Sequence, residues 1–142
     1  MSLILRLNLY ALGVGAVGIG TSMFLLGAET TALFFASLNA ALWSQPDEIA
    51  DLSTPNVDSE LRFYAVFWVT YGVFVVRTAH NLSKHLQLVP LLAGLFFAGG
   101  IGRLLSLLLI GEPHPLFVRL MIVELILPLF LIWMWAGVNR QR

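Results

Sequence analysis

Two ionisable residues, Arg103 and Glu124, interrupt long apolar stretches of the sequence. A charged side chain inside a bilayer costs at least about 2.5–3.5 kcal/mol, so such residues are expected to pair and to mark functional sites. An arginine can bind the phosphate or carboxylate head of a ligand, and a buried glutamate can serve as a general acid or base. Any chemistry of this chain is therefore expected around these two residues.

The two residues are expected to lie at similar depths in neighbouring helices. Their apolar stretches, 88–110 and 116–138, are joined by a short turn that contains Gly and Pro, which predicts an antiparallel hairpin. Arg103 precedes the end of its stretch by seven residues, or about 10 Å, and Glu124 follows the turn by nine, or about 13 Å. We therefore predict an interhelical ion pair, which either fixes the helix register or forms part of a binding or catalytic pocket.

Further polar residues are expected in the same half of the predicted bundle. Glu60, Arg62 and Tyr64 open the apolar stretch 61–79, where the two charges could equally be ordinary charges at a membrane edge. Ser106 lies one helical turn from Arg103 on the same face. The predicted ligand-binding residues are Arg103, Glu124, Glu60, Arg62, Tyr64 and Ser106. Glu124 is also the candidate catalytic residue.

Prolines are expected to shape the helices that carry these groups. Pro90 and Pro115 suit the first turns of their helices, where a missing N–H costs nothing. Pro128 follows Glu124 by four residues and would remove the hydrogen bond that the Glu124 carbonyl otherwise accepts, kinking the helix beside the acid. His114 lies in the turn between prolines and is expected to be solvated.

The composition indicates an all-α integral membrane protein. The 142 residues are 58% hydrophobic and 11% charged, whereas a soluble domain carries about 25% charged residues. A membrane span needs about 20 apolar residues. Four stretches meet or approach that length: 7–28, 61–79, 88–110 and 116–138. We predict a four-helix transmembrane bundle that forms a single domain over residues 1–142.

The apolar segment 31–43 is too short to cross a bilayer, and it is expected to form an extra interfacial or re-entrant helix after the first span. Small residues on two of the spans are expected to allow close helix contact. They are Gly94, Ala98 and Gly102 on the third span and Ala11, Gly15, Gly18 and Gly27 on the first.

The charges outside the spans predict one orientation. The segment 44–60 is acidic and has no Lys or Arg, whereas the connection 77–87 contains Arg77, Lys84 and two histidines. Because basic loops stay on the cytoplasmic side, both termini and the connection 77–87 are expected in the cytoplasm. The turn after the third span is then expected on the outer side.

Several classes of function are disfavoured by the composition. The formal net charge is +0, which argues against nucleic-acid binding. There is no cysteine, which excludes disulfides, iron–sulfur clusters and thiolate metal sites. None of the three histidines lies inside an apolar stretch, so a haem held between transmembrane histidines is disfavoured. No cofactor and no metal site are predicted.

Several short motifs in order resemble a known family. The motifs are Glu60-Leu61-Arg62-Phe63-Tyr64, Gly102-Arg103-Leu104-Leu105-Ser106, Gly111-Glu112-Pro113 and the late Glu124. Together they resemble a family of small bacterial four-span membrane proteins, domain of unknown function 4345, which is loosely similar in architecture to DoxX-like proteins. The resemblance implies the fold and a bacterial inner (plasma) membrane location. It implies no reaction.

The sequence therefore predicts an inner-membrane protein that binds a small amphiphile, such as a lipid, quinone or isoprenoid, in a polar pocket in the outer half of the bundle. The first alternative is a membrane enzyme that acts on a lipophilic substrate, with Glu124 as acid and base. The second is an accessory structural subunit of a larger membrane complex, or a homo-oligomer. The expected partner is a membrane lipid or another lipophilic small molecule.

Overall fold

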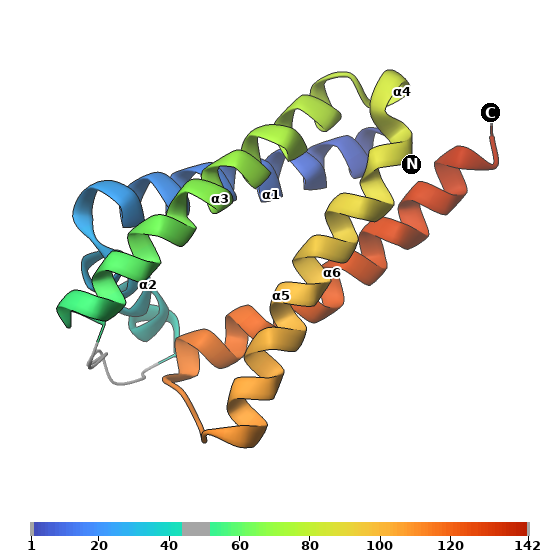
Figure 1. Ribbon diagram of the computed structural model, residues 1–142. Coiled ribbons are helices and arrows are strands. Elements are labelled where there is room, and N and C mark those ends of the chain that lie inside the picture. The colour runs from blue at the N-terminus through green and yellow to red at the C-terminus, as the bar shows by residue number, and fades with distance from the viewer. Residues whose placement is uncertain (1, 44–51, 142) are drawn as a thin grey trace. The chain divides into compact units, whose positions relative to one another are not determined.

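The computed structural model describes residues 2–43 and 52–141, and in this part of the chain the regular structure is entirely helical (Figure 1). The elements in chain order are α1 (Ser2–Leu26), α2 (Ala28–Trp43), α3 (Pro55–His80), α4 (Leu82–His85), the short 3₁₀ helix η1 (Leu86–Leu88), α5 (Val89–Leu109) and α6 (Pro115–Asn139). The predicted all-α class is confirmed.

Four helical segments are long and apolar enough to cross a membrane. They are Ser2–Leu26, Pro55–His80, Leu82–Leu109 and Pro115–Asn139. Each corresponds to one predicted span, so the prediction of four candidate transmembrane helices is confirmed. Three of the helices begin several residues before the predicted spans, because helical structure continues into polar flanking sequence that the apolar pattern does not include.

The predicted short helix after the first span is present as α2. It begins at Ala28 rather than at residue 31, directly after Gly27, whose φ of 88° ends α1. Glycine tolerates this left-handed conformation, so Gly27 separates the two helices. With 16 residues α2 is shorter than a span, and its interfacial or re-entrant position stays a prediction. The acidic residues at positions 47, 48 and 51 lie outside the described residues.

The chain divides into two compact units, which are described separately. The first comprises Met1–Leu12 and Phe74–Arg142, and the second comprises Gly13–Val73. The helices α1 and α3 therefore each contribute one end to either unit. The prediction of a single membrane domain over residues 1–142 stays a prediction.

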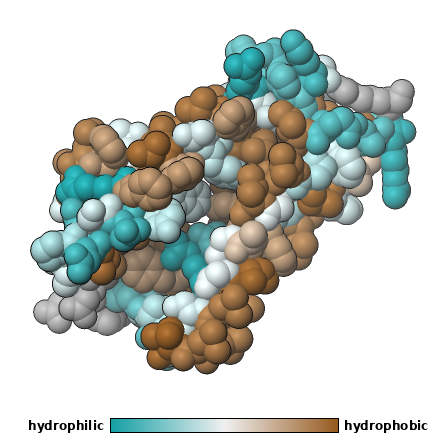
Figure 2. All heavy atoms as spheres, viewed as in Figure 1, coloured by the Kyte–Doolittle hydropathy of each residue, from teal (hydrophilic) through white to brown (hydrophobic). Residues whose placement is uncertain are grey.

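The first unit is dominated by the predicted hairpin of α5 and α6, which run side by side and antiparallel (Figure 1). Pro90 and Pro115 lie in the first turns of these helices, as predicted. Gly111 has a φ of 135° in the connection, which requires glycine. On the face shown in Figure 2, hydrophobic side chains predominate over α5 and the turn of the hairpin, and hydrophilic ones gather around α4. This distribution fits a unit whose hairpin lies in lipid and whose α4 end lies in water.

The other end of the first unit has a buried core and polar contacts at its surface. Its most deeply buried residues include Leu5, Leu9, Val75, Thr78, Ala79, Leu86, Val89, Ala93, Leu131 and Met134. The Tyr10 hydroxyl lies 3.1 Å from Nδ1 of His80, and Nε2 of Gln87 donates to Oδ1 of Asn139 at 3.1 Å. These contacts connect α1 to α3 and η1 to α6 at the end that carries the basic connection.

In the second unit, α1 and α3 pack through glycine. A Cβ atom at Gly72 would lie 2.7 Å from both the carbonyl oxygen of Gly13 and the backbone nitrogen of Val17. A Cβ atom at Gly20 would lie 2.9–3.0 Å from atoms of α3. The backbones of the two helices can therefore approach closely only because these positions lack a side chain.

Of the glycines predicted to allow close helix contact, Gly27 makes one, whereas four others do not. Gly15 and Gly18 on α1, and Gly94 and Gly102 on α5, have open space within 4 Å of the position that a Cβ would take. For these four glycines the predicted close contact is therefore wrong within the described part of the chain. A spacing of four residues finds a helix face, but it does not determine which face meets a neighbour.

Candidate functional site

The predicted ion pair between α5 and α6 is present in the first unit. Nε of Arg103 donates to both carboxylate oxygens of Glu124, at 3.0 Å to Oε1 and 2.8 Å to Oε2. The Glu124 side chain is 5% exposed, whereas that of Arg103 is 34% exposed. The acid is therefore enclosed in the hairpin, and the base reaches from it towards the surface.

Gly100 lets α6 approach α5 closely enough for this pair to form. A Cβ at Gly100 would lie 3.0 Å from Cβ of Glu124 and 3.0 Å from Cγ of Leu125. Gly100 precedes Arg103 by three residues, so the two positions share one face of α5. The glycine thus brings the backbone of the acid against α5, one turn before the arginine with which it pairs.

Phe117 holds the guanidinium from a second direction. The ring lies on α6, seven residues before Glu124 and hence on the same face of the helix. Its centroid is 5.6 Å from Cζ of Arg103. A cation–π contact of this kind contributes about 0.5–2 kcal/mol, depending on desolvation. Together, the carboxylate and the ring restrict how the guanidinium can turn.

The arrangement leaves one edge of the guanidinium open. An arginine has five N–H donors, and both hydrogen bonds to Glu124 use the single Nε–H. Within the part of the chain that the structure describes, neither Nη group of Arg103 makes a hydrogen bond. The four donors on the Nη groups therefore have no acceptor among the described residues.

The backbone beside the acid has a further polar atom without its usual partner. Pro128 is buried inside α6, four residues after Glu124, and has no N–H to donate. The Glu124 carbonyl thus lacks its helical hydrogen bond. In a bilayer such a carbonyl requires another donor or a water molecule.

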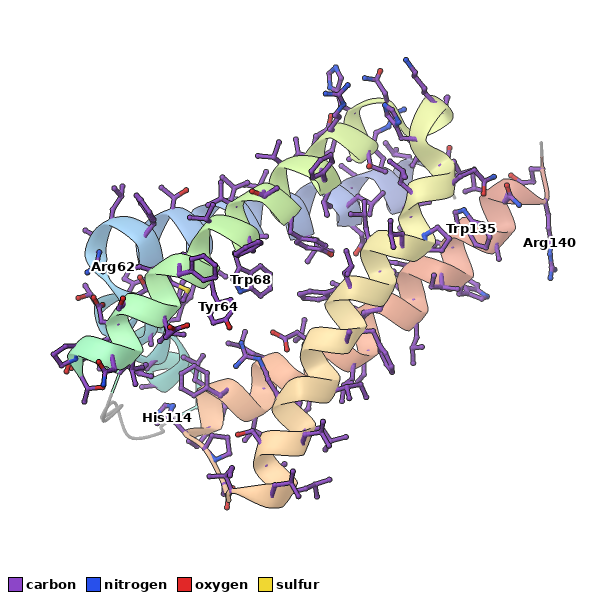
Figure 3. The ribbon with its side chains drawn as sticks, viewed as in Figure 1. Arg62, Tyr64, Trp68, His114, Trp135 and Arg140 are labelled. Carbon is purple, nitrogen blue, oxygen red and sulfur yellow. The ribbon has the colours of Figure 1, made fainter. Side chains whose placement is uncertain are left out.

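His114 and Ser106 lie near the turn of the hairpin. His114 caps α6, because its Nδ1 accepts a hydrogen bond of 3.2 Å from the backbone N–H of Leu116. The sequence predicted a solvated turn residue and did not predict this cap. Figure 3 shows His114 at the start of the helix. Ser106 is exposed on α5, and its carbonyl accepts hydrogen bonds from Ile110 and Gly111 at the helix end.

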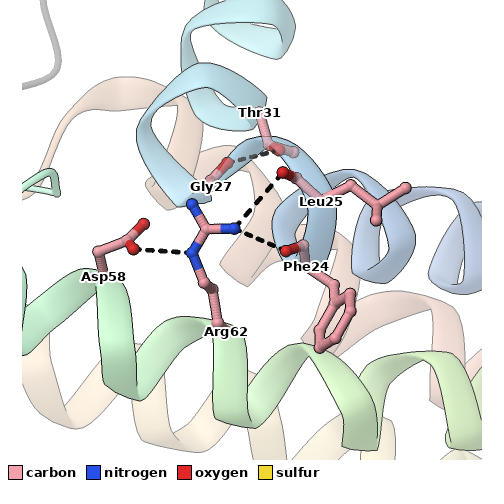
Figure 4. A network of polar contacts seen from close by, with 6 residues as sticks. All are labelled: Phe24, Leu25, Gly27, Thr31, Asp58 and Arg62. Carbon is pink, nitrogen blue, oxygen red and sulfur yellow. Dashed lines mark hydrogen bonds and ion pairs between the residues drawn. The ribbon is translucent and has the colours of Figure 1, made fainter.

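The other predicted residues, Glu60, Arg62 and Tyr64, lie on α3 in the second unit. Nε of Arg62 donates to Oδ2 of Asp58 at 2.7 Å. Its Nη1 donates to the carbonyl oxygens of Phe24 at 2.7 Å and Leu25 at 3.4 Å, which are the last carbonyls of α1 (Figure 4). Arg62 therefore caps the C-terminus of α1, and a ligand-binding role for it stays a prediction.

The cap of α1 continues into the start of α2. The Thr31 hydroxyl donates to the Gly27 carbonyl at 2.8 Å and lies 2.8 Å from the Ser22 hydroxyl. A Cβ at Gly27 would lie 3.0 Å from both Nη2 of Arg62 and Oδ1 of Asp58. The whole corner between α1 and α2 is thus built around the absence of a side chain at Gly27.

Glu60 and Tyr64 are exposed on α3. The Tyr64 ring packs edge-on against Phe63, with centroids 5.5 Å apart, and Figure 3 shows it on the same helix as Arg62 and Trp68. Their predicted part in a ligand site is not supported by a contact that the structure describes, and it stays a prediction. Three of the six predicted residues thus lie in each unit, and among the six the structure describes a hydrogen-bonded contact only between Arg103 and Glu124.

One buried polar group was not predicted. Nε1 of Trp135, on α6, is buried, and it has no hydrogen-bond partner among the described residues. Figure 3 shows this side chain beside α5. Within the described residues, no group of three or more histidine, aspartate or glutamate side chains is placed to hold a metal ion.

The profile of a family described as a domain of unknown function (DUF4345) matches residues 4–135 of the chain. No curated protein and no solved structure matches it. The matched range includes the Arg103–Glu124 pair, Gly100 and the cap at Arg62, so the family match covers the predicted residues of both units. The chain belongs to the family of this domain of unknown function.

Proposed function

We propose that this protein binds a small amphiphile, such as a lipid, quinone or isoprenoid, at the Arg103–Glu124 pair. The observation that carries the proposal is the open edge of the guanidinium. Arg103 uses only Nε for Glu124 and keeps both Nη groups for another acceptor. If the pair only fixed the helix register, a fully engaged and enclosed guanidinium would be expected, because unsatisfied donors are costly in a membrane.

The surface around the pair supports an apolar tail on the ligand. Exposed apolar side chains follow Arg103 on α5 and flank Glu124 on α6. They include Leu105, Leu108, Leu109, Ile122, Val123 and Ile126. Such a surface can hold an acyl or isoprenoid chain, while the few polar atoms fix the head of the ligand.

For the setting, we propose the inner (plasma) membrane of a bacterium, with both termini in the cytoplasm. Support comes from the exposed basic residues Arg77, Lys84 and Arg140, which lie at the ends of helices in the first unit. The hairpin turn then faces outward. Arg103 precedes the end of α5 by six residues, about 9 Å, so in the proposed orientation the pair would lie in the outer half of the bilayer.

Two other functions compete with this proposal. A membrane enzyme would use Glu124 as its acid or base, and an accessory subunit would depend on a partner protein. If the protein is such an enzyme, Glu124→Gln would abolish turnover. If the protein is an accessory subunit, a tagged chain would purify with a stoichiometric partner protein. The open guanidinium edge favours a ligand over a purely structural role, since an accessory subunit does not require donors that point away from the acid.

Native mass spectrometry with lipid analysis tests the proposal. Arg103→Ala would leave a buried acid unpaired, which costs about 3–5 kcal/mol, so gentler variants are needed. Arg103→Lys keeps the charge and removes the fork of Nη donors. The double variant Arg103→Gln with Glu124→Gln removes both charges together. Arg140→Gln removes an exposed charge at the far end of α6 and serves as the control.

We expect one amphiphile to stay bound to the wild type and to the Arg140→Gln control. We expect the same molecule to be lost from Arg103→Lys and from the double variant. Equal occupancy in all four proteins would place the ligand elsewhere and overturn the proposal. So would a wild type that binds none of a set of added lipids, quinones and isoprenoids.

A further inference from the structure

We infer that the head of the bound amphiphile is uncharged and presents oxygen acceptors, as a quinone carbonyl or a lipid ester does, and is not a phosphate or carboxylate. This inference rests on the proposed function and narrows its ligand class. It follows from the charge balance of the site and from which donors of Arg103 remain.

The charge of Arg103 is already balanced inside the hairpin. Glu124 accepts two hydrogen bonds of 2.8 and 3.0 Å from Nε, so the pair is neutral as a unit. The only other charged residue within α5 or α6 is Arg119, which precedes Glu124 by five residues. Five residues correspond to about 140° around a helix, so Arg119 does not share the face that carries Glu124.

An anionic head would disturb this balance. It would add a second negative charge beside one arginine, at a depth where a net charge is costly. It would also lie close to the Glu124 carboxylate, which is fixed on the other edge of the same guanidinium. The anion could be accommodated only if it displaced Glu124, which is 5% exposed and enclosed by the contact at Gly100.

An uncharged acceptor avoids both costs. A carbonyl oxygen has two lone pairs and can accept from one or both Nη groups. Its hydrogen bonds to a charged donor are stronger than those between neutral groups. The Phe117 ring, 5.6 Å from Cζ of Arg103, covers part of the guanidinium and adds no charge. The site therefore gains strong hydrogen bonds and keeps a net charge of zero.

A competition experiment with matched chains tests this inference. Purified full-length protein in neutral detergent is loaded with a fluorescent amphiphile. The competitors are a decyl quinone and a monodecanoyl glycerol as uncharged heads, and decanoate and decyl phosphate as anionic heads. The comparison of quinone with ester distinguishes the two sources of an uncharged acceptor.

For the wild type we expect the better uncharged head to compete at least 10-fold more strongly than either anion. Glu124→Gln removes the negative charge and keeps the side-chain shape, so the site becomes cationic. In this variant we expect the preference to reverse in favour of the anions. The Arg140→Gln control is expected to keep the wild-type order.

The possible outcomes separate this inference from the proposed function. Stronger competition by an anion in the wild type would overturn the inference and leave the binding function intact. An unchanged preference in a folded Glu124→Gln protein would also overturn it, since charge balance would then not set the selectivity. The proposed function itself is overturned if no competitor displaces the fluorescent amphiphile from the wild type. It is also overturned if the competitors displace the amphiphile from Arg103→Lys as they do from the wild type. The wild-type comparison does not depend on any variant that could fail to fold.

Discussion

Substitution of Gly100 by alanine is expected to separate α5 from α6 and to weaken the Arg103–Glu124 pair. The added Cβ would lie 3.0 Å from Cβ of Glu124 and 3.0 Å from two atoms of Leu125. Ordinary carbon–carbon contacts are about 3.5–4.0 Å, so α6 must move by about 0.5–1 Å. The Leu125 side chain can turn away, but Cβ of Glu124 is fixed to the helix backbone.

The movement is large enough to affect the ion pair. The shorter hydrogen bond, 2.8 Å from Nε to Oε2, would lengthen towards the limit of a hydrogen bond. Overpacking costs about 1–3 kcal/mol, and replacing a helical glycine by alanine returns about 0.5–1 kcal/mol. We therefore expect Gly100→Ala to lower the free energy of unfolding by about 0.5–2 kcal/mol.

The same helix offers a matched control. Gly94 has open space within 4 Å of its Cβ position, so Gly94→Ala gains helix propensity without a clash. Unfolding of both variants in mixed detergent micelles, followed by circular dichroism, measures the difference. We expect Gly100→Ala to be about 1–3 kcal/mol less stable than Gly94→Ala. Equal stability of the two variants would refute the argument that Gly100 sets the distance between the helices.

Two further predictions concern the second unit and use the same unfolding assay. Gly72→Ala places a Cβ 2.7 Å from backbone atoms of α1, which cannot turn away, and should destabilise by about 3 kcal/mol or more. Gly18→Ala, with open space around it, is its control, and similar stability of the two would contradict the packing argument. Arg62→Gln removes the charged donor to the Phe24 carbonyl and should cost about 1–2 kcal/mol, less than for a fully buried bond because the arginine is partly exposed. A cost equal to that of Arg140→Gln would show that the cap contributes nothing.

The hairpin and its ion pair could be predicted from the sequence because simple rules determine them. A connection of five residues joins two long apolar helices, so they must lie antiparallel and adjacent. Residues at equal distances from the turn then lie at equal depth. A charged pair at that depth has a strong reason to form, because either partner alone is costly in lipid.

The packing of glycines could not be predicted in the same way. The apolar residues of α6 are spread around its whole circumference, so their pattern does not show which face meets α5. Whether Gly100 or the face that carries Gly94 and Gly102 meets α6 depends on how the two helices are rotated about their axes. The four-residue spacing predicted that the face of Gly94 and Gly102 makes the contact, whereas in the structure Gly100 lies against Glu124. A signal was available, since Gly100 lies one turn before the arginine that must reach the acid.

The role of Arg62 was hidden for a different reason. Its acceptors are backbone carbonyls 37 and 38 residues earlier in the chain, and backbone groups leave no mark in a sequence. His114 was better signalled. It immediately precedes a proline that begins a helix, and the residue before such a proline often caps the helix. The expectation of a solvated histidine gave too little weight to that position.

The two arginines show how the same residue type serves different ends in the two units. Arg62 uses Nε for an acid one turn earlier and Nη1 for carbonyls of another helix. Arg103 also uses Nε for an acid, but its Nη groups meet no acceptor in the described chain. Arg62 thus shows what a structural arginine in this protein looks like when its outer edge is satisfied by the fold. The outer edge of Arg103 has no acceptor among the described residues, and this difference from Arg62 is the reason for the proposal that a bound amphiphile supplies one.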